Sequence, residues 1–204
     1  MERSAYDRWY ELDDTHFWRI AKRELVLELV ARHKPAGAEL RLLDIGGACT
    51  LLSRELGRFG AITLVEHDAE MARFAAETLG LEVKQGSLPD GLPADLGGPF
   101  DVITLIDVLE HIDDDVAAAR AVRGLLRPGG LLIVSVPAVP LLWSEHDVSV
   151  HHKRRYMAGT LRPVLAAAGL EVERLTYRVL LLALRRHRVD RAVRRHLFRA
   201  MKSR

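Results

Sequence analysis

The chain has 204 residues, of which 49% are apolar and 6% aromatic, and its formal net charge is +2. This length and composition indicate one folded domain around a single core and exclude a disordered chain. The lone cysteine argues against a disulfide scaffold, and the acidic and aromatic residues at the N-terminus argue against a signal peptide. The apolar runs are far shorter than the ~20 residues of a membrane span. We therefore expect a cytoplasmic protein.

Helical and strand patterns alternate along the chain. Apolar residues at helical spacing predict a helical segment over residues 4–33, and Asp68 and Gly80 are typical of the start and the end of a later helix. The alternation indicates right-handed βαβ units, and hence an α/β fold whose mostly parallel sheet has helices on both faces. Strands are predicted over residues 40–45, 61–65, 81–84, 100–106, 131–136 and 170–177, and helices over 51–59, 68–79, 113–126 and 158–168.

Residues suited to ligand binding follow four of the predicted strands. They are Asp44–Thr50, Glu66, Gly86–Leu88 and Asp107–His111. Ligands of parallel sheets bind outside the carboxyl ends of the strands, at the point where the strand order reverses. We therefore expect the four segments to converge on one crevice.

The first of these segments looks like a nucleotide-binding turn, but it lacks the G-x-G-x-x-G that a nicotinamide dinucleotide requires. S-adenosylmethionine has a sulfonium and an α-amino group in place of phosphates, and these favour a carboxylate at the strand end. Asp44 stands there, and Glu66 follows 22 residues later, where it could accept both ribose hydroxyls. Each acid alone could instead be structural, Asp44 as a turn cap and Glu66 as a solvated strand end, but their joint spacing favours S-adenosylmethionine.

Four stretches resemble the class I S-adenosylmethionine-dependent methyltransferases, in particular their type-11-like small-molecule branch. They are LLDIGGACTLLSREL, ITLVEHDAEMARFA, PFDVITLIDVLEHIDD and LLRPGGLLIVSVP, and they occur in family order and spacing over residues 40–137. The resemblance implies a Rossmann-like fold that binds S-adenosylmethionine, with Asp44, Gly46 and Asp107 at the methionine end and Glu66 at the ribose. The cofactor-binding residues that it implies are Asp44, Gly46, Gly47, Ala48, Glu66, His67, Ser87, Leu88 and Asp107.

Three residues depart from the family pattern. Ala48 and Thr50 stand where glycines are usual, and Ser87 replaces an acid that commonly contacts the adenine. Ala48 is tolerable if its φ is negative, since only positive φ strongly demands glycine. The Thr50 hydroxyl is suited to cap the next helix. We expect cofactor binding to survive these substitutions, with a non-catalytic relic of the fold as the alternative.

Histidines are the candidate catalytic residues. Methyl transfer is an in-line displacement, and an oxygen nucleophile also needs a base whose pKa lies near the working pH, which favours histidine. We predict His111 and His146 as catalytic, with Asp147 and one of the following histidines completing a base and its orienter. A metal site built from His146, Asp147, His151 and His152 would lack characteristic ligand spacing, so no metal is predicted.

The segment WSEHDVSVHHKRRY at residues 143–156 resembles the LWS-x-HD…H-x-RRY segment of a subgroup of type-11-like bacterial methyltransferases. HFWRIAKRELVLELV resembles the opening helix of that subgroup. The resemblance implies a small polar or anionic acceptor from a natural-product, sugar or lipid pathway, methylated on oxygen. Arg154 and Arg155 could hold a carboxylate or phosphate, or they could instead pair with surface acids. The predicted substrate-binding residues are Trp18, Trp143, His151, Arg154, Arg155 and Tyr156.

We assign residues 1–184 to one methyltransferase domain. Its parts are a helical lid at 1–34, where Tyr6, Trp9, Phe17 and Trp18 either cover the acceptor or pack on the core, a cofactor-binding core at 40–137, and a substrate-side loop, helix and strand at 138–178. Residues 185–204 hold nine Lys or Arg and one acid. Their apolar spacing predicts a basic amphipathic helix that docks on the acidic body, on an acidic partner or on a membrane surface.

Two further points concern partners. A seventh strand, usual in the family, is not evident after Tyr177, so the sheet edge could be bare, covered by the tail or paired in a homodimer. Base N-methyltransferases need an [N/D/S]-P-P-aromatic element after the fourth strand, whereas this chain has IDVL at 106–109. Nucleic acid is therefore not expected as a partner, and an RNA or lipid-linked substrate steered by the tail is the alternative to a small-molecule acceptor.

Overall fold

The computed structural model describes residue 10 and residues 12–48 and 50–177. The chain divides into two compact units, Met1–Glu171 and Val172–Arg204, and the fold described below is that of the first. Tyr6, Trp9 and the predicted tail helix at 185–204 lie outside the described residues. In the described part of the chain, no helix has the length and apolar character needed to cross a membrane.

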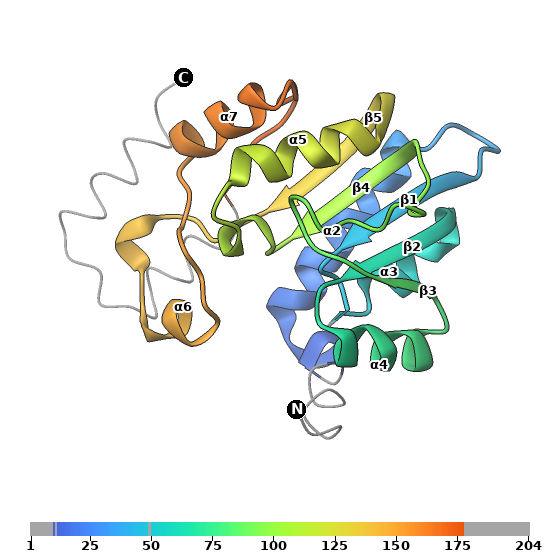
Figure 1. Ribbon diagram of the computed structural model, residues 1–204, viewed down its shortest axis with the longest axis horizontal. Coiled ribbons are helices and arrows are strands. Elements are labelled where there is room, and N and C mark those ends of the chain that lie inside the picture. The colour runs from blue at the N-terminus through green and yellow to red at the C-terminus, as the bar shows by residue number, and fades with distance from the viewer. Residues whose placement is uncertain (1–9, 11, 49, 178–204) are drawn as a thin grey trace. The chain divides into compact units, whose positions relative to one another are not determined.

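A five-stranded parallel sheet forms the centre of this unit. Its strands are β1 (Leu40–Ile45), β2 (Gly60–Glu66), β3 (Glu82–Gln85), β4 (Phe100–Ile106) and β5 (Leu126–Ser135), in the spatial order β3-β2-β1-β4-β5 (Figure 1). Every residue of β1 except Arg41 is buried, as expected of a central strand covered on both faces. The predicted α/β class and parallel sheet are confirmed.

Helices cover both faces of the sheet. The chain runs outward from β1 to β2 and β3 through α3 (Leu52–Leu56) and α4 (Ala69–Leu79), and in the opposite direction from β4 to β5 through α5 (Asp115–Leu125). Because such crossovers are right-handed, the two directions place their helices on opposite faces. α2 (Phe17–His33) packs beside α3, and α7 (Ala158–Ala167) packs beside α5 (Figure 1).

The main apolar cluster lies between α2, α3 and the sheet. Its buried members are Val26, Leu27, Val30, Leu40, Leu42, Leu52, Leu56, Phe59, Ile62, Val102 and Ile133. This packing attaches the helical segment that precedes the sheet to the same face as the helix that follows β1. The end of β1 is thereby held against two helices.

The ends of α4 and the start of α5 are capped by residues next to them in the sequence. Asp68 accepts a hydrogen bond from the Met71 backbone N–H at 2.8 Å, and Gly80 ends α4 in the left-handed conformation, both as predicted. Asp114 caps α5 in the same way through the Ala117 N–H at 2.8 Å.

Three predicted elements differ from the structure. The helix at 51–59 is a short α3 followed by a 3₁₀ turn, η1 (Gly57–Phe59), and β5 begins at Leu126, five residues before the predicted start. The predicted strand at 170–177 is wrong, because these residues form no regular element. An alternating pattern cannot make a strand without a neighbouring strand for its backbone groups, and that neighbour is not readable from local sequence.

Candidate functional site

Four loops meet at the carboxyl edge of the sheet, as predicted. Ile45 at the end of β1 is in register with Val65 of β2 and with Leu105 of β4, and Glu66 is in register with Gln85 of β3. The order reverses here, since the chain leaves β1 toward β2 and later returns on the other side through β4. This is the position at which open α/β sheets bind ligands.

The glycine turn after β1 leaves no room for side chains at two positions. Gly46 has φ +78°, and a Cβ there would lie 2.6 Å from Cγ2 of Val108, which follows β4. At Gly47 a Cβ would lie 2.0 Å from Oδ2 of Asp44. The turn is therefore seated directly on the loop after β4 and on the acid that precedes it.

Asp44 lies under this turn, with no solvent-exposed surface. Its Oδ2 accepts a hydrogen bond from the Ser53 hydroxyl at 2.5 Å, and its Oδ1 accepts one from the Thr104 hydroxyl at 2.6 Å. Burial raises the pKa of Asp44 against the opposing effect of these two hydrogen bonds. The contacts of Asp44 hold β1, α3 and β4 together, and its predicted contact with the methionine end of the cofactor stays a prediction.

The two substituted positions of the turn have different outcomes. Ala48 is not among the residues with positive φ, so its backbone does not require glycine and the condition set for this substitution is met. The prediction that Thr50 caps the next helix is wrong. The Thr50 hydroxyl donates to the Gly47 carbonyl at 3.1 Å, and α3 begins after Leu51, whose N–H donates to Oδ2 of Asp13 at 2.9 Å.

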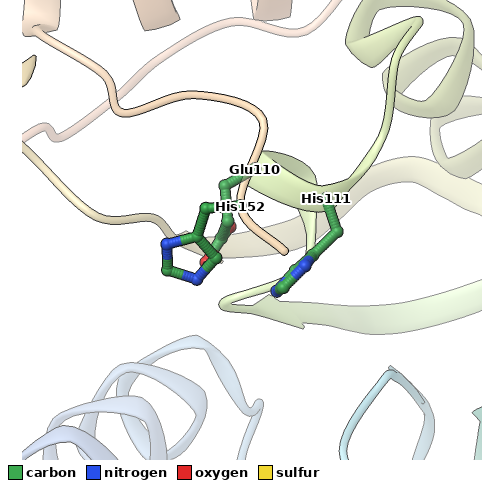
Figure 2. A group of neighbouring side chains, drawn as sticks. All are labelled: Glu110, His111 and His152. Atoms are coloured by element: carbon green, nitrogen blue, oxygen red, sulfur yellow. The ribbon is translucent and has the colours of Figure 1, made fainter. Parts of the chain in front are cut away.

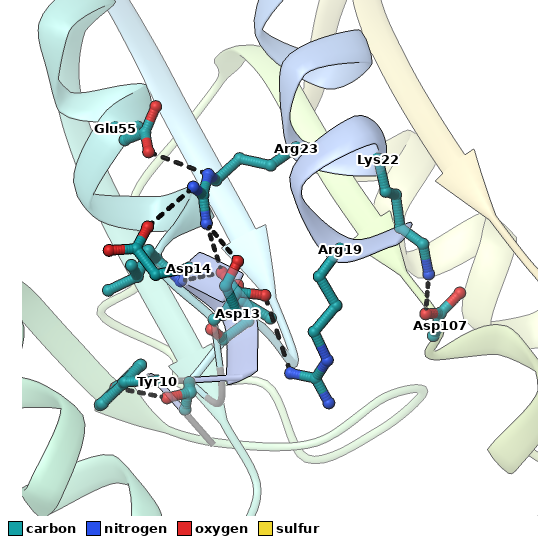
Figure 3. A network of polar contacts seen from close by, with 12 residues as sticks. Tyr10, Asp13, Asp14, Arg19, Lys22, Arg23, Glu55 and Asp107 are labelled. Atoms are coloured by element: carbon teal, nitrogen blue, oxygen red, sulfur yellow. Dashed lines mark hydrogen bonds and ion pairs between the residues drawn. The ribbon is translucent and has the colours of Figure 1, made fainter. Parts of the chain in front are cut away.

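Asp13 belongs to a polar network that joins the N-terminal segment to the turn (Figure 3). Arg23 of α2 contacts Asp13 at 2.8 Å and Glu55 of α3 at 2.9 Å. The Tyr10 hydroxyl donates to the carbonyl of Ala48 at 2.6 Å. The segment predicted as a lid is thus tied to the glycine turn itself.

The acids after β2 and β4 lie on either side of the turn. Oε1 of Glu66 accepts hydrogen bonds from the backbone N–H groups of His67 at 2.9 Å and Asp68 at 3.1 Å. Asp107 has φ +56°, accepts a hydrogen bond from the Ser135 hydroxyl at 3.1 Å and forms an ion pair with Lys22 of α2. A positive φ at an aspartate is uncommon and marks this position for attention.

The loop after β3 forms a tight turn at the far side of the edge. The backbone groups of Ser87 and Gly91 exchange two hydrogen bonds, at 2.9 and 3.0 Å. Ser87 is exposed and Leu88 is half-buried. Their predicted contact with the adenine stays a prediction.

A buried acid and two histidines gather beyond Asp107 (Figure 2). Glu110 and His111 lie in the 3₁₀ turn η2 (Leu109–His111), and His152 comes from the segment after β5. The His111 and His152 ring centroids are 4.8 Å apart, and Nε2 of His152 lies 3.8 Å from Oε1 of Glu110. One nitrogen or oxygen atom from each of the three side chains lies within 4.8 Å of the others, a spacing that a cation could bridge.

Glu110 is the unusual member of this group. It is fully buried, and among the described residues neither of its carboxylate oxygens has a hydrogen-bond partner. Burial, reinforced by the nearby charge of Asp107, raises the pKa of Glu110 to about 8. Burial and His152 lower the pKa of His111. Near neutral pH, therefore, Glu110 holds a proton and His111 is neutral.

His152 is held from its other side by Asp147, which lies in the short helix α6 (Glu145–Ser149). Nδ1 of His152 is 2.9 Å from Oδ1 of Asp147. Arg155 donates to both oxygens of Asp147, at 2.7 and 2.8 Å, and the Ser144 N–H donates at 2.8 Å. Burial alone would raise the pKa of Asp147, but these hydrogen bonds outweigh it and hold that pKa well below its usual range.

The remaining predicted substrate residues have other surroundings. Arg154 pairs with Asp115 at 3.0 Å, and the buried Tyr156 hydroxyl donates to the same carboxylate at 2.7 Å. Arg155 pairs with Asp147, so both arginines are paired with acids, but these acids are buried and not on the surface, where the alternative interpretation had them. Trp18 is half-buried, and Trp143, His146 and His151 are exposed.

A family model described as a methyltransferase domain matches residues 15–175. The chain belongs to this methyltransferase family.

Relatives and solved structures agree with this assignment. The chain is 38% identical, over 82% of its own length and 77% of the relative's, to a ubiquinone biosynthesis O-methyltransferase from Xanthomonas axonopodis pv. citri (strain 306). It resembles the S-adenosylmethionine-dependent methyltransferase structure from Mesorhizobium loti with a TM-score of 0.58 and 18% identity, over 72% of this chain and 81% of that one.

A cofactor-bound structure is also similar. It is the S-adenosylmethionine-bound amino pentose methyltransferase of calicheamicin biosynthesis from Micromonospora echinaspora, with a TM-score of 0.50 and 26% identity, over 59% of this chain and 52% of that one. The protein is an S-adenosylmethionine-dependent methyltransferase.

The sequence of this methyltransferase does not single out Glu110, which is only part of a motif. It groups Asp147 with His146 and one of the following histidines, and the structure shows that His152 is the histidine in contact with Asp147. The available signals were the neighbouring Glu110 and His111 after a strand end and the five-residue spacing from Asp147 to His152. Neither signal shows that η2 contacts the segment after α6. The structure shows this contact, because the Lys153 backbone N–H donates to the Glu110 carbonyl at 2.8 Å.

Replacing Gly46 with alanine should weaken S-adenosylmethionine binding by about tenfold or more, because Cβ would displace Val108 and shift the turn. Gly169→Ala is a matched control, since Gly169 also has φ +78° but nothing lies within 4 Å of its Cβ position. Both variants should lose stability in urea unfolding because of the positive φ, Gly46→Ala more than Gly169→Ala because of its contact with Val108, and only Gly46→Ala should lose affinity in calorimetry. Equal cofactor affinities in the two variants would show that the turn does not contact the cofactor.

Glu110 should make the folded state less stable as pH rises. Its folded-state pKa of about 8 lies above the ordinary 4.5, so the native state holds the extra proton between these values, and stability is lost as pH rises through this window. The free energy of unfolding should fall by a few kcal/mol from pH 5 to pH 8.5, and Glu110→Gln should reduce that slope. Glu24→Gln, at an exposed site in α2, should leave the slope unchanged. Identical slopes for wild type and Glu110→Gln would contradict the shift.

Proposed function

We propose that this methyltransferase transfers the methyl group of S-adenosylmethionine to an oxygen of a small polar acceptor, with a histidine as general base. The observation that carries the proposal is the His111–His152 pair, which lies at the carboxyl end of β4 with its ring centroids 4.8 Å apart. The name of the Xanthomonas relative, an O-methyltransferase, supports oxygen as the methylated atom.

A hydroxyl acceptor needs such a base. The acceptor oxygen attacks the methyl carbon, the carbon–sulfur bond breaks, and its electron pair stays on sulfur to give S-adenosylhomocysteine. The hydroxyl proton must leave to a nearby group. Burial and His152 lower the pKa of His111, so the pair includes a neutral imidazole that can accept the proton at neutral pH.

The cofactor would lie along the sheet edge. We assign the turn at Gly46, Gly47 and Ala48 to the methionine end, because it follows the central strand and its close packing on Val108 and Asp44 fixes its position. Glu66 and His67 would contact the ribose, and Ser87 and Leu88 the adenine. Asp107 would receive the α-amino group, in exchange for its ion pair with Lys22.

The acceptor would enter beside the segment after β5. Trp18 of α2, and Trp143 and His151 of this segment, have exposed surface and are the proposed acceptor contacts. The pairing of Arg154 and Arg155 with Asp115 and Asp147 leaves these cations engaged, so we do not assign the arginines to an anionic acceptor. A neutral hydroxylated acceptor fits this arrangement better than a carboxylate or phosphate.

The test is product analysis with the full chain. The protein is incubated with S-adenosylmethionine bearing a ¹³C-labelled methyl group and a panel of phenols, sugars, amines and thiols, and S-adenosylhomocysteine release is followed by mass spectrometry. We expect turnover with hydroxylated acceptors and a ¹³C shift of an O-methyl ether. Turnover restricted to amine or thiol acceptors would overturn the assignment to oxygen.

The double variant His111→Ala/His152→Ala should lower kcat roughly 10²–10⁴-fold, the range for loss of a general base. Cofactor affinity measured by calorimetry should stay close to that of the wild type. His16→Ala, which removes an exposed histidine before α2, should retain full activity. An unchanged kcat in the double variant would mean that no histidine of this pair accepts the proton.

A further inference from the structure

The Asp147 carboxylate fixes the tautomer of His152. Asp147 is fully buried, and its two oxygens accept hydrogen bonds from Arg155 and from the N–H and hydroxyl of Ser144. A carboxylate surrounded by so many donors is ionised, and an ionised carboxylate can only accept hydrogen bonds. The 2.9 Å contact from Nδ1 of His152 to Oδ1 of Asp147 must therefore have the proton on Nδ1.

With Nδ1 protonated, the basic atom of His152 is Nε2. This nitrogen lies 3.8 Å from Oε1 of Glu110, too far for a direct hydrogen bond. The His111 ring meets the His152 ring edge-on, at a centroid distance of 4.8 Å (Figure 2). Nε2 of His152 thus faces η2, the turn that follows β4 and lies beside the proposed reaction site.

The other histidines are placed differently. His146 is exposed, and its ring centroid lies 6.3 Å from that of His152. His111 has its ring against the backbone of His151. Of these three histidines in the described chain, His152 is the one whose ring nitrogen contacts a buried carboxylate. The groups that face it are Glu110 and His111 from η2, and His146, Asp147 and Arg155 from its own segment.

We infer that His152 is the general base of the methyl transfer, and that Asp147, clamped by Arg155, is the positioning residue that keeps Nε2 of His152 free to take the acceptor proton. This inference rests on the proposed O-methylation. In the step, the acceptor oxygen forms a bond to the methyl carbon, the carbon–sulfur bond breaks with its electron pair on sulfur, and the hydroxyl proton moves to Nε2. Asp147 then stabilises the imidazolium through its hydrogen bond to Nδ1.

Single variants and added imidazole separate the two roles. His152→Ala should lower kcat roughly 10²–10⁴-fold with little change in the acceptor KM, and millimolar imidazole should restore part of the rate, because it can occupy the space of the missing ring. Asp147→Asn should lower kcat without rescue by imidazole, since the ring is still present but held in the wrong tautomer. Calorimetry with S-adenosylmethionine on each variant checks that the cofactor site is intact.

A second variant serves as the control for misfolding. If Asp147→Asn does not fold, Arg155→Lys keeps the charge but loses the two-point clamp, and it should give a smaller loss of kcat with the same absence of rescue. Glu145→Gln, at an exposed position of α6, should keep at least half of the wild-type kcat.

Three outcomes would overturn the inference. O-methylation by His152→Ala within threefold of the wild-type rate would show that His152 is not the base. Imidazole rescue of His111→Ala but not of His152→Ala would assign that role to His111. Loss of wild-type activity in a chelator, restored by magnesium or manganese, would show that a cation activates the acceptor instead. The first two leave O-methylation itself intact, whereas failure of the proposed function would show as absence of any O-methyl product from the wild-type protein.

Discussion

The candidate site depends on one buried carboxylate. Asp44 is the penultimate residue of the central strand, and its two oxygens accept hydrogen bonds from Ser53 of α3 and Thr104 of β4. A buried acid destabilises a protein unless its oxygens are hydrogen-bonded, so the strand, the helix and the neighbouring strand must stay in this arrangement. The glycine turn rests on this carboxylate at Gly47, where no side chain fits. The buried carboxylate of Asp44 therefore fixes the position of the turn.

Two other buried acids of the site, Asp147 and Glu110, show that hydrogen bonds decide whether a buried carboxyl group is ionised. Asp147 is surrounded by donors and remains ionised, whereas Glu110, equally buried, has no partner among the described residues for either oxygen and holds a proton near neutral pH. The two acids lie on opposite sides of the same imidazole. His152 is therefore placed between a fixed negative charge and a neutral acid, which gives its two nitrogens different environments.

Much of the fold could be predicted because its signals are local. The Asp68 cap, the Gly80 helix end and the apolar strands each depend on residues within a few positions of one another. The cap of α3 was not predictable in this way, because Asp13 reaches Leu51 from 38 residues away, while Thr50 at the expected position bonds elsewhere. The strand predicted at 170–177 failed for a related reason, since a strand needs a neighbour and not only a pattern.

The sequence by itself determined the parallel α/β architecture, the loops that meet at the sheet edge and the methyltransferase family, because strand periodicity, glycine turns and motif order are properties of short stretches. The tertiary structure alone decided which side chains of those loops touch. It paired Arg154 and Arg155 with acids, placed Glu110 beside His152 and tied the N-terminal segment to the glycine turn. These contacts join residues 8 to 42 positions apart, and burial and charge pairing become definite only when the packed core brings such segments together.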